Sequence, residues 1–107
     1  MSYPPVMEQM TVEDREGVRW IHLSGDLDQS EVLQIKAEFD RAVNAAPGDV
    51  VLGLRGVTFM GTLGIGLLVS TRDRVMKQGR KLALSEVPES LERTFEAMTL
   101  NEIFDRV

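Results

Sequence analysis

Residues 49–66 read DVVLGLRGVTFMGTLGIG, and this stretch decides the fold. Its first part, residues 50–54, is short and almost wholly apolar, as a strand is when both of its faces are buried in a parallel sheet. Its last part, residues 61–66, is rich in glycine and leads into apolar residues at helical spacing. A buried strand that turns into a helix is typical of a β-α-β unit, so the sequence predicts a parallel sheet.

Two strands and a helix are predicted before this stretch. Residues 6–13 and 18–24 have the composition of strands and are separated by turn residues, which predicts a hairpin. Gly25 is expected to end the second strand, which is expected to be covered on both faces. A helix follows from Asp28 or Ser30. Its apolar residues recur at helical spacing and are Val32, Ile35, Phe39, Ala42 and Val43.

Three more elements are predicted after the glycine-rich segment and its helix. Residues 81–84 form a short apolar strand, and Pro88 suits the first turn of a third helix. The apolar stripes of the second and third helices are expected to include Met76 and Met98, respectively. Residues 100–104 are expected to form a last short helical turn.

The predicted order is β-β-α-β-α-β-α with a small final helix. It indicates an α/β fold, a small mixed sheet of about four to five strands packed against helices. Because β-α-β crossovers are right-handed, the helices that join parallel strands are expected on one side of the sheet. The length of 107 residues suits a single domain, which we expect over residues 6–107 after a flexible arm at residues 1–5.

Composition excludes several classes of function. The chain has 12 Lys and Arg against 17 Asp and Glu, a net charge of −5, which opposes binding to nucleic acid or to an anionic membrane. It has no cysteine and one histidine, so a disulfide, a thiolate nucleophile and a metal site rich in Cys or His are excluded. No nucleophile–base pair is evident, so no enzyme activity is expected. The absence of a long apolar run or a secretion signal predicts a cytoplasmic protein without membrane insertion.

The motifs in the chain resemble those of the STAS domain, the fold of bacterial anti-sigma factor antagonists. In that family a buried strand leads through G-V-x-F-[MI] into a loop D-S-[ST]-G-[LI]-G where a helix begins, and residues 49–66 follow this order. The stretch Ser24-Gly25-Asp26-Leu27-Asp28 is similar to the family's G-[ED]-L-D, and Leu100-Asn101-Glu102-Ile103-Phe104 is similar to its L-x-x-[IL]-F. The resemblance spans about residues 6–107.

This resemblance implies a regulatory binding module that exchanges partners. Family members of this kind bind an anti-sigma factor that is also a serine/threonine kinase, and so release a sigma factor. Phosphorylation of the loop hydroxyl ends binding, and a PP2C-like phosphatase restores it. No cofactor is implied, and a homodimer is left open. The implied phosphoacceptor is Thr62, and the implied partner-binding residues are Asp26, Asp28, Met60, Gly61, Thr62, Leu63 and Gly64.

The chain departs from the family pattern at three positions. Gly61 replaces the loop aspartate, Leu63 replaces the second hydroxyl, and Gly53 replaces the strand aspartate. Thr62, at the first hydroxyl position, is then the single acceptor in the loop. These departures favour an alternative function, a STAS scaffold or adaptor without a phosphoswitch, such as a cytosolic subunit of a lipid transport system or a member of a signalling complex.

Structural roles compete with functional ones at each candidate residue. Thr62 and Asp28 both precede helices and are candidate N-caps, whose side-chain oxygens accept backbone N–H bonds. Met60 suits the buried core as well as an interface. His22 has no evident partner in the sequence and is interpreted as a packed or surface residue. The basic residues Arg72, Arg74, Lys77, Arg80 and Lys81 form either a solvated face or a docking surface for an acidic partner.

Overall fold

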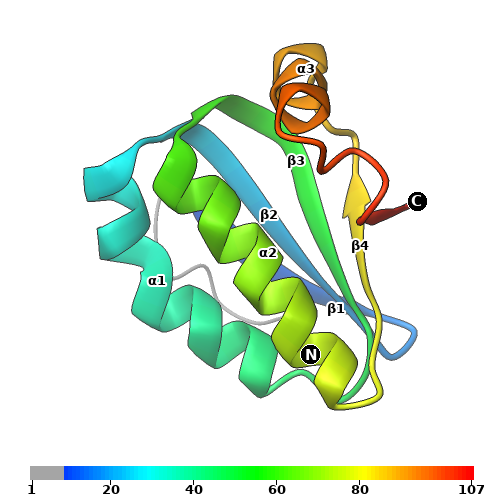
Figure 1. Ribbon diagram of the computed structural model, residues 1–107. Coiled ribbons are helices and arrows are strands. Elements are labelled where there is room, and N and C mark those ends of the chain that lie inside the picture. Colours follow the sequence, from blue (N-terminus) through cyan, green and yellow to red (C-terminus); the bar gives the residue numbers. More distant parts are fainter. Residues whose placement is uncertain (1–8) are drawn as a thin grey trace.

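The computed structural model describes residues 9–107, which form one mixed sheet and three helices (Figure 1). The expected arm at residues 1–5 and the first part of the expected strand at residues 6–13 lie outside the described residues. The elements in chain order are β1 (Met10–Arg15), β2 (Val18–Leu27), α1 (Gln29–Asn44), β3 (Val50–Met60), α2 (Thr62–Lys77), β4 (Leu82–Ser85), α3 (Glu89–Ala97) and β5 (Asp105–Arg106).

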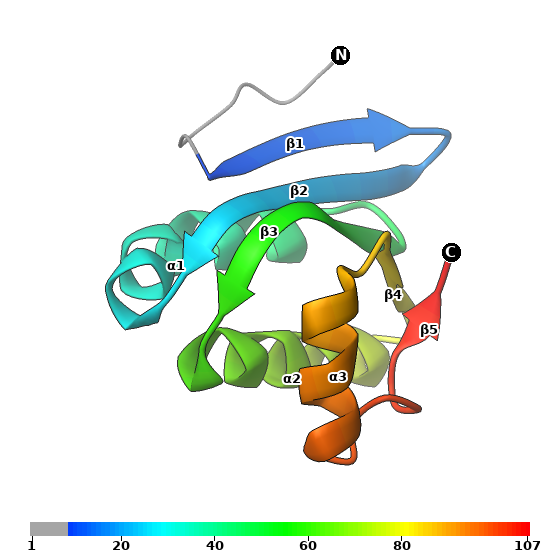
Figure 2. The same ribbon diagram turned by 90° about the horizontal axis from the view of Figure 1, so that it is seen from above.

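The sheet has five strands in the order β1-β2-β3-β4-β5. β1 and β2 form the expected antiparallel hairpin, and all other neighbours are parallel. Figure 2 shows all three helices on the same side of the sheet, as right-handed crossovers require. The α/β fold predicted from the sequence is thus confirmed.

The core lies between this helix-bearing face and the helices. All five apolar residues predicted for the stripe of α1 are buried, and Phe39 is fully so. Two predictions for the other helices are wrong, because Met76 and Met98 are exposed. Val75 takes the core position in the last turn of α2, so the next residue points about 100° away from it. Met98 is the C-cap of α3 and lies beyond its last turn.

The two central strands are longer than predicted. Gly25 does not end β2. It adopts a positive φ of 83°, and the strand continues to Leu27 with a shifted register against β3. The expectation that β2 is covered on both faces is also wrong. Trp20 and His22 alternate with the buried Ile21 and Leu23, so they lie on the sheet face that no helix of residues 9–107 covers, and both are half-buried.

A short strand that was not predicted follows the helical turn expected at residues 100–104, where the N–H of Ile103 donates to the carbonyl of Leu100 at 3.3 Å. Residues 101–103 form turns, and β5 then pairs with β4 in parallel. The aromatic ring of Phe104 is buried at 5.5 Å from that of Phe95, centroid to centroid. This packing on α3 directs the chain back onto the sheet, where the N–H of Val107 donates to the carbonyl of Leu84 at 3.0 Å.

Candidate functional site

Two strand-to-helix junctions lie side by side at one end of the sheet. β2 ends at Leu27, and Asp28 is the N-cap residue of α1. β3 ends at Met60, and Gly61 stands at the N-cap position of α2. The N–H of Gly61 donates to the carbonyl of Leu27 at 3.1 Å, which fixes one junction to the other. The geometry follows from the parallel pairing of β2 and β3, since the carboxyl ends of parallel strands meet at one edge.

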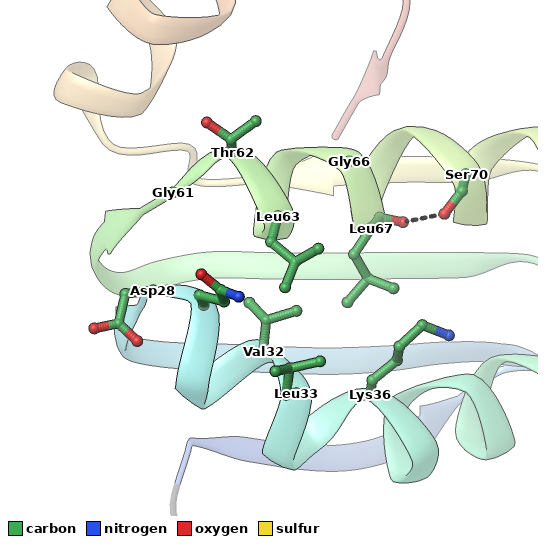
Figure 3. Close-up of a pocket in the computed structure, with 11 residues that line it drawn as sticks. Asp28, Val32, Leu33, Lys36, Gly61, Thr62, Leu63, Gly66, Leu67 and Ser70 are labelled. Atoms are coloured by element: carbon green, nitrogen blue, oxygen red, sulfur yellow. Dashed lines mark hydrogen bonds between the residues drawn. The ribbon is translucent and has the colours of Figure 1, made fainter.

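Thr62 is the first residue of α2, and its side chain is exposed. Its interpretation as an N-cap is wrong, because Gly61 occupies that position. In Figure 3 the Thr62 side chain points away from α1, and its hydroxyl forms no hydrogen bond with any residue from 9 to 107. A lone hydroxyl is therefore presented outward at the start of a helix.

Gly61 leaves the N-terminus of α2 without a side-chain cap. Its φ of −82° and ψ of 179° are extended backbone that any residue adopts, so the conformation does not require glycine. A Cβ atom at this position would meet the ring of Phe59 at 3.5 Å, an ordinary contact. Glycine here therefore removes a capping group and a charge rather than relieving strain.

The two candidate aspartates are exposed beside this junction. Asp28 caps α1 as predicted, since its Oδ1 accepts from the N–H of Ser30 at 3.1 Å and of Glu31 at 3.4 Å. Asp26 lies near the end of β2, in register with Phe59 of β3. Both carboxylates contribute negative charge to the surface near Thr62.

Two of the predicted partner-binding residues are not accessible. Met60 is 6% exposed and belongs to the core, as its alternative interpretation had it. Gly64 is buried because α2 crosses closely over the β2–α1 junction, where a Cβ atom would lie 2.7 Å from Cγ of Met60 and 3.4 Å from the carbonyl oxygen of Leu27. Both residues shape the site without lying on its surface.

A groove between α1 and α2 begins at this junction and encloses about 840 Å³ (Figure 3). Its walls are largely apolar, and we call it the α1–α2 groove. Its lining includes Val32, Leu33, Lys36, Leu63, Gly66 and Leu67. Leu63 points from α2 into the groove, so the residue that replaces the second hydroxyl faces α1.

Three large apolar side chains are exposed around the junction. The exposed fractions are 61% for Leu33, 53% for Phe59 and 43% for Leu63. Leu33 and Phe59 were missed in the sequence analysis. Leu33 gave a signal, since it is an apolar residue outside the buried stripe of its helix.

Charged side chains hold α1 and α2 together farther along the groove. The ammonium of Lys36 lies 2.6 Å from one carboxylate oxygen of Asp40, and a guanidinium nitrogen of Arg74 lies 3.3 Å from the other. Arg74 also donates to the side chain of Asn44 at 3.1 Å. The contacts of Arg74 join the two helices, whereas Lys36 and Asp40 both belong to α1.

Three of the basic residues predicted at the end of α2 and just after it, Arg72, Arg74 and Arg80, bond to other parts of the fold. Arg72 donates to the carbonyl of Ile103 at 2.7 Å, which anchors the C-terminal segment. Arg80 donates to the carbonyls of Gly48 at 2.9 Å and Val43 at 3.3 Å, behind the end of α1. These bonds favour a structural role over a docking surface for an acidic partner.

The sheet face that carries no helix contains a second polar cluster. Nε2 of His22 lies 3.0 Å from a carboxylate oxygen of Glu13, a partner that the sequence did not reveal. Glu13 also pairs with Arg15, whose guanidinium lies 4.6 Å from the centroid of the Trp20 ring. The hydrogen bond from Arg15, and then that with His22, holds the pKa of Glu13 below its usual range.

Among residues 9–107 the structure shows no group of three His, Asp or Glu side chains suited to a metal ion. Within the same residues no helix has the length and apolar character needed to cross a bilayer. The surface around Thr62 thus combines exposed apolar side chains, two exposed carboxylates and one hydroxyl without a hydrogen bond to residues 9–107.

Comparison with known proteins places this architecture in a family. The STAS domain model matches residues 9–107, and the chain therefore belongs to the STAS domain family. The chain is 25% identical over 96 residues to the anti-sigma F factor antagonist of Paenibacillus polymyxa, covering 89% of this chain and 82% of that protein. It is 27% identical over 94 residues to the anti-sigma-B factor antagonist of Bacillus subtilis (strain 168), covering 88% and 85%, respectively.

Solved structures show the same fold. An anti-sigma factor antagonist from Mycobacterium paratuberculosis superimposes with a TM-score of 0.82 at 23% identity, covering 99% of this chain and 89% of that one. The Bacillus cell fate determinant SpoIIAA in its phosphorylated form gives a TM-score of 0.70 at 20% identity, covering 92% and 90%. The chain thus has a STAS fold like that of the anti-sigma factor antagonists.

Proposed function

We propose that the chain is a cytoplasmic regulatory binding module without enzyme activity, which binds an anti-sigma factor that is also a serine/threonine kinase. Binding frees the sigma factor for transcription. Phosphorylation of Thr62 ends the binding, and a PP2C-like phosphatase reverses it. The names of the two curated relatives and the phosphorylated form of SpoIIAA support this assignment.

The observation that carries the proposal is the position of the Thr62 hydroxyl. It is exposed and free of hydrogen bonds to residues 9–107, at the start of a helix. In the transfer step its oxygen attacks the γ-phosphorus of ATP, the bond from that phosphorus to the bridging oxygen breaks, and ADP leaves. A base on the kinase takes the hydroxyl proton. All of these steps need an accessible hydroxyl and none needs the domain to unfold.

A phosphate at Thr62 acts on the surface rather than on the fold. It adds a charge of about −1.5 to −2 and three acceptor oxygens next to the exposed side chain of Leu63. Burying that group in an interface requires its desolvation, and the carboxylates of Asp26 and Asp28 increase the local negative charge. The helix N-terminus beside it tolerates an anion, so the domain stays folded.

The test uses a kinase-type anti-sigma factor from the same organism, with ATP and magnesium. We expect one phosphate per chain, mapped by mass spectrometry to Thr62, and none on the Thr62→Val variant. Thr62→Glu should bind the kinase at least tenfold more weakly than the native chain, and Thr62→Ser should behave like the native chain. Phosphate at another residue, or equal binding by Thr62→Glu, would contradict the proposal.

A scaffold or adaptor without a phosphoswitch is the second candidate function. It is favoured by Gly61 and Leu63, which stand where the STAS pattern has the loop carboxylate and the second hydroxyl. In that case Thr62→Glu and Thr62→Val bind the partner as the native chain does. A stable complex with a permease or its ATPase subunit, unchanged by ATP, would favour the adaptor.

A further inference from the structure

The walls of the α1–α2 groove repeat at helical spacing. On α2 the residues facing the groove are Leu63, Leu67 and Ser70, which are four and three residues apart. On α1 the matching positions are Leu33 and Lys36, which are three residues apart, and Val32 beside Leu33 is buried. Side chains spaced in this way form ridges about one helical turn apart, and the intervals between them match the side chains of a third helix.

Gly66 leaves a gap in the α2 wall. It is exposed between Leu63 and Leu67, and a Cβ atom at this position would meet nothing within 4 Å. The gap is a hole into which one large apolar side chain of a bound helix fits, as knobs fit holes in packed helices. No backbone strain or close contact explains glycine here.

The occupants other than a partner's helix fit the groove less well. The other exposed large apolar side chains of residues 9–107 are Phe59, Met76, Met98 and Val107, which lie on separate elements and form no stripe. Apart from Leu33 and Leu63, which line the groove itself, a second copy therefore offers no described helix face with a stripe of exposed apolar side chains. Leu33 is 61% exposed at the rim of the groove. An acyl chain lying between the helices would leave part of the Leu33 side chain in water.

Charges along the groove define an orientation for the bound helix. Asp28 lies at the end where α1 and α2 begin, and Lys36 lies about two turns farther along α1. Among residues 9–107 Asp28 has no cation partner, whereas the ammonium of Lys36 lies 2.6 Å from Asp40. Basic residues of a bound helix over Asp28 complement its carboxylate, and an acidic residue at the other end lies near the exposed side chain of Lys36. Basic residues are most stable at a helix C-terminus and acidic ones at the N-terminus, so the bound helix runs antiparallel to α1.

We infer that the α1–α2 groove binds an amphipathic helix of the partner protein, antiparallel to α1, with one large apolar residue over Gly66. This deepens the proposed function, because it specifies the partner segment that docks beside Thr62. Leu63 serves as an anchor in this groove, which explains why an apolar residue stands next to the single hydroxyl. Recognition of helices by apolar grooves is a general mode of binding.

The probe is a synthetic alanine-based peptide of about 17 residues, long enough to form a helix in water. It carries leucines at i, i+4 and i+7, a glutamate at its N-terminal end and two lysines at its C-terminal end. The peptide is titrated into the full ¹⁵N-labelled chain, and backbone amide shifts are followed. We expect shifts confined to α1 and α2 around the groove, and weaker binding by the peptide with the charged ends exchanged.

Variants of the chain make the test specific. Gly66→Leu places a side chain in the gap, where its Cβ atom meets nothing within 4 Å, and should weaken peptide binding at least tenfold. Leu33→Glu should do the same. Met98→Gln changes an exposed apolar residue outside the groove and should bind like the native chain. A peptide with glutamine in place of leucine should not bind.

Several results would overturn the inference. They are no shifts at millimolar peptide, shifts around Trp20 on the open sheet face, or undiminished binding by Gly66→Leu. A dimer in sedimentation that Gly66→Leu abolishes would assign the groove to a second copy, and displacement of the peptide by micromolar dodecanoate would assign it to an acyl chain. The titration uses no kinase, so its failure leaves the test of Thr62 standing, and failure of phosphorylation leaves the groove standing.

Discussion

The ring of His22 occupies the space that a side chain at residue 53 would need. The two residues are paired in register between β2 and β3, and a Cβ atom on Gly53 would lie 2.5 Å from Nδ1 of His22. The ring of Trp20 stacks on that of His22 with centroids 5.9 Å apart. The glycine that replaces the family's strand aspartate and the histidine beside it therefore form one packed unit.

Gly53→Ala is expected to destabilise the chain by about 1–3 kcal/mol, because the new methyl group forces the His22 ring out of its position. In the His22→Ala background the same change should cost much less. Urea unfolding of the native chain, both single variants and the double variant gives the coupling free energy. Additive effects would show that the two positions do not share this space.

Much of the fold could be predicted because its signals are local. The apolar stripe of α1 and the apolar strand β3 follow directly from the spacing of residues. β5 could not, because two exposed residues carry no strand pattern, and their position beside β4 depends on the packing of Phe104 on Phe95. The continuation of β2 through Gly25 likewise depends on its pairing with β3.

The site was only partly predictable for a related reason. The motif placed Thr62 correctly at the start of a helix, but the sequence did not distinguish the capping residue from the first helical residue. The exposure of Leu33 and Phe59 depends on how α1, β3 and α2 meet at one end of the sheet. The burial of Gly64 depends on the close crossing of α2 over Leu27, which no local pattern reports.

Gly61→Asp is expected to stabilise the chain by about 0.5–1 kcal/mol. The carboxylate accepts from the free N–H groups of α2 and interacts favourably with the positive end of the helix, and the backbone at Gly61 allows any residue. Thermal unfolding of both proteins measures the change. Gly61→Asn separates the two effects, since it caps without charge and its gain should not depend on salt. No gain from either variant would contradict an uncapped α2.

Asp14→Asn tests the ion pair that closes the hairpin. The carboxylate of Asp14 accepts two bonds from the buried Arg19, at 2.8 Å and 3.0 Å. We expect a loss of about 1–3 kcal/mol at neutral pH, because the charged partner loses both bonds to a carboxylate. Urea unfolding measures the loss. Asp73→Asn, at an exposed pair with Arg72, should change stability by less than about 0.5 kcal/mol.

The same pair predicts how stability depends on pH. The bonds from Arg19 hold the pKa of Asp14 below its ordinary value of 3.8, although partial burial opposes this shift. The stabilisation is therefore complete above pH 3.8 and is lost as the pH falls through the lower pKa of the folded state. The difference in stability between the native chain and Asp14→Asn should shrink across that range, and a constant difference would contradict the assignment.

Gly64→Ala and Gly66→Ala form a matched pair in the first turns of α2. Alanine favours a helix over glycine by about 1 kcal/mol, and a Cβ atom at residue 66 meets nothing, so Gly66→Ala should stabilise the chain by up to that amount. At residue 64 the Cβ atom meets Met60 at 2.7 Å and the Leu27 carbonyl oxygen at 3.4 Å, so overpacking of about 1–3 kcal/mol opposes the same gain. Gly64→Ala should therefore unfold at lower urea concentration than Gly66→Ala. Equal midpoints would show that α2 does not lie closely over the β2–α1 junction, which is the contact that sets the position of Thr62.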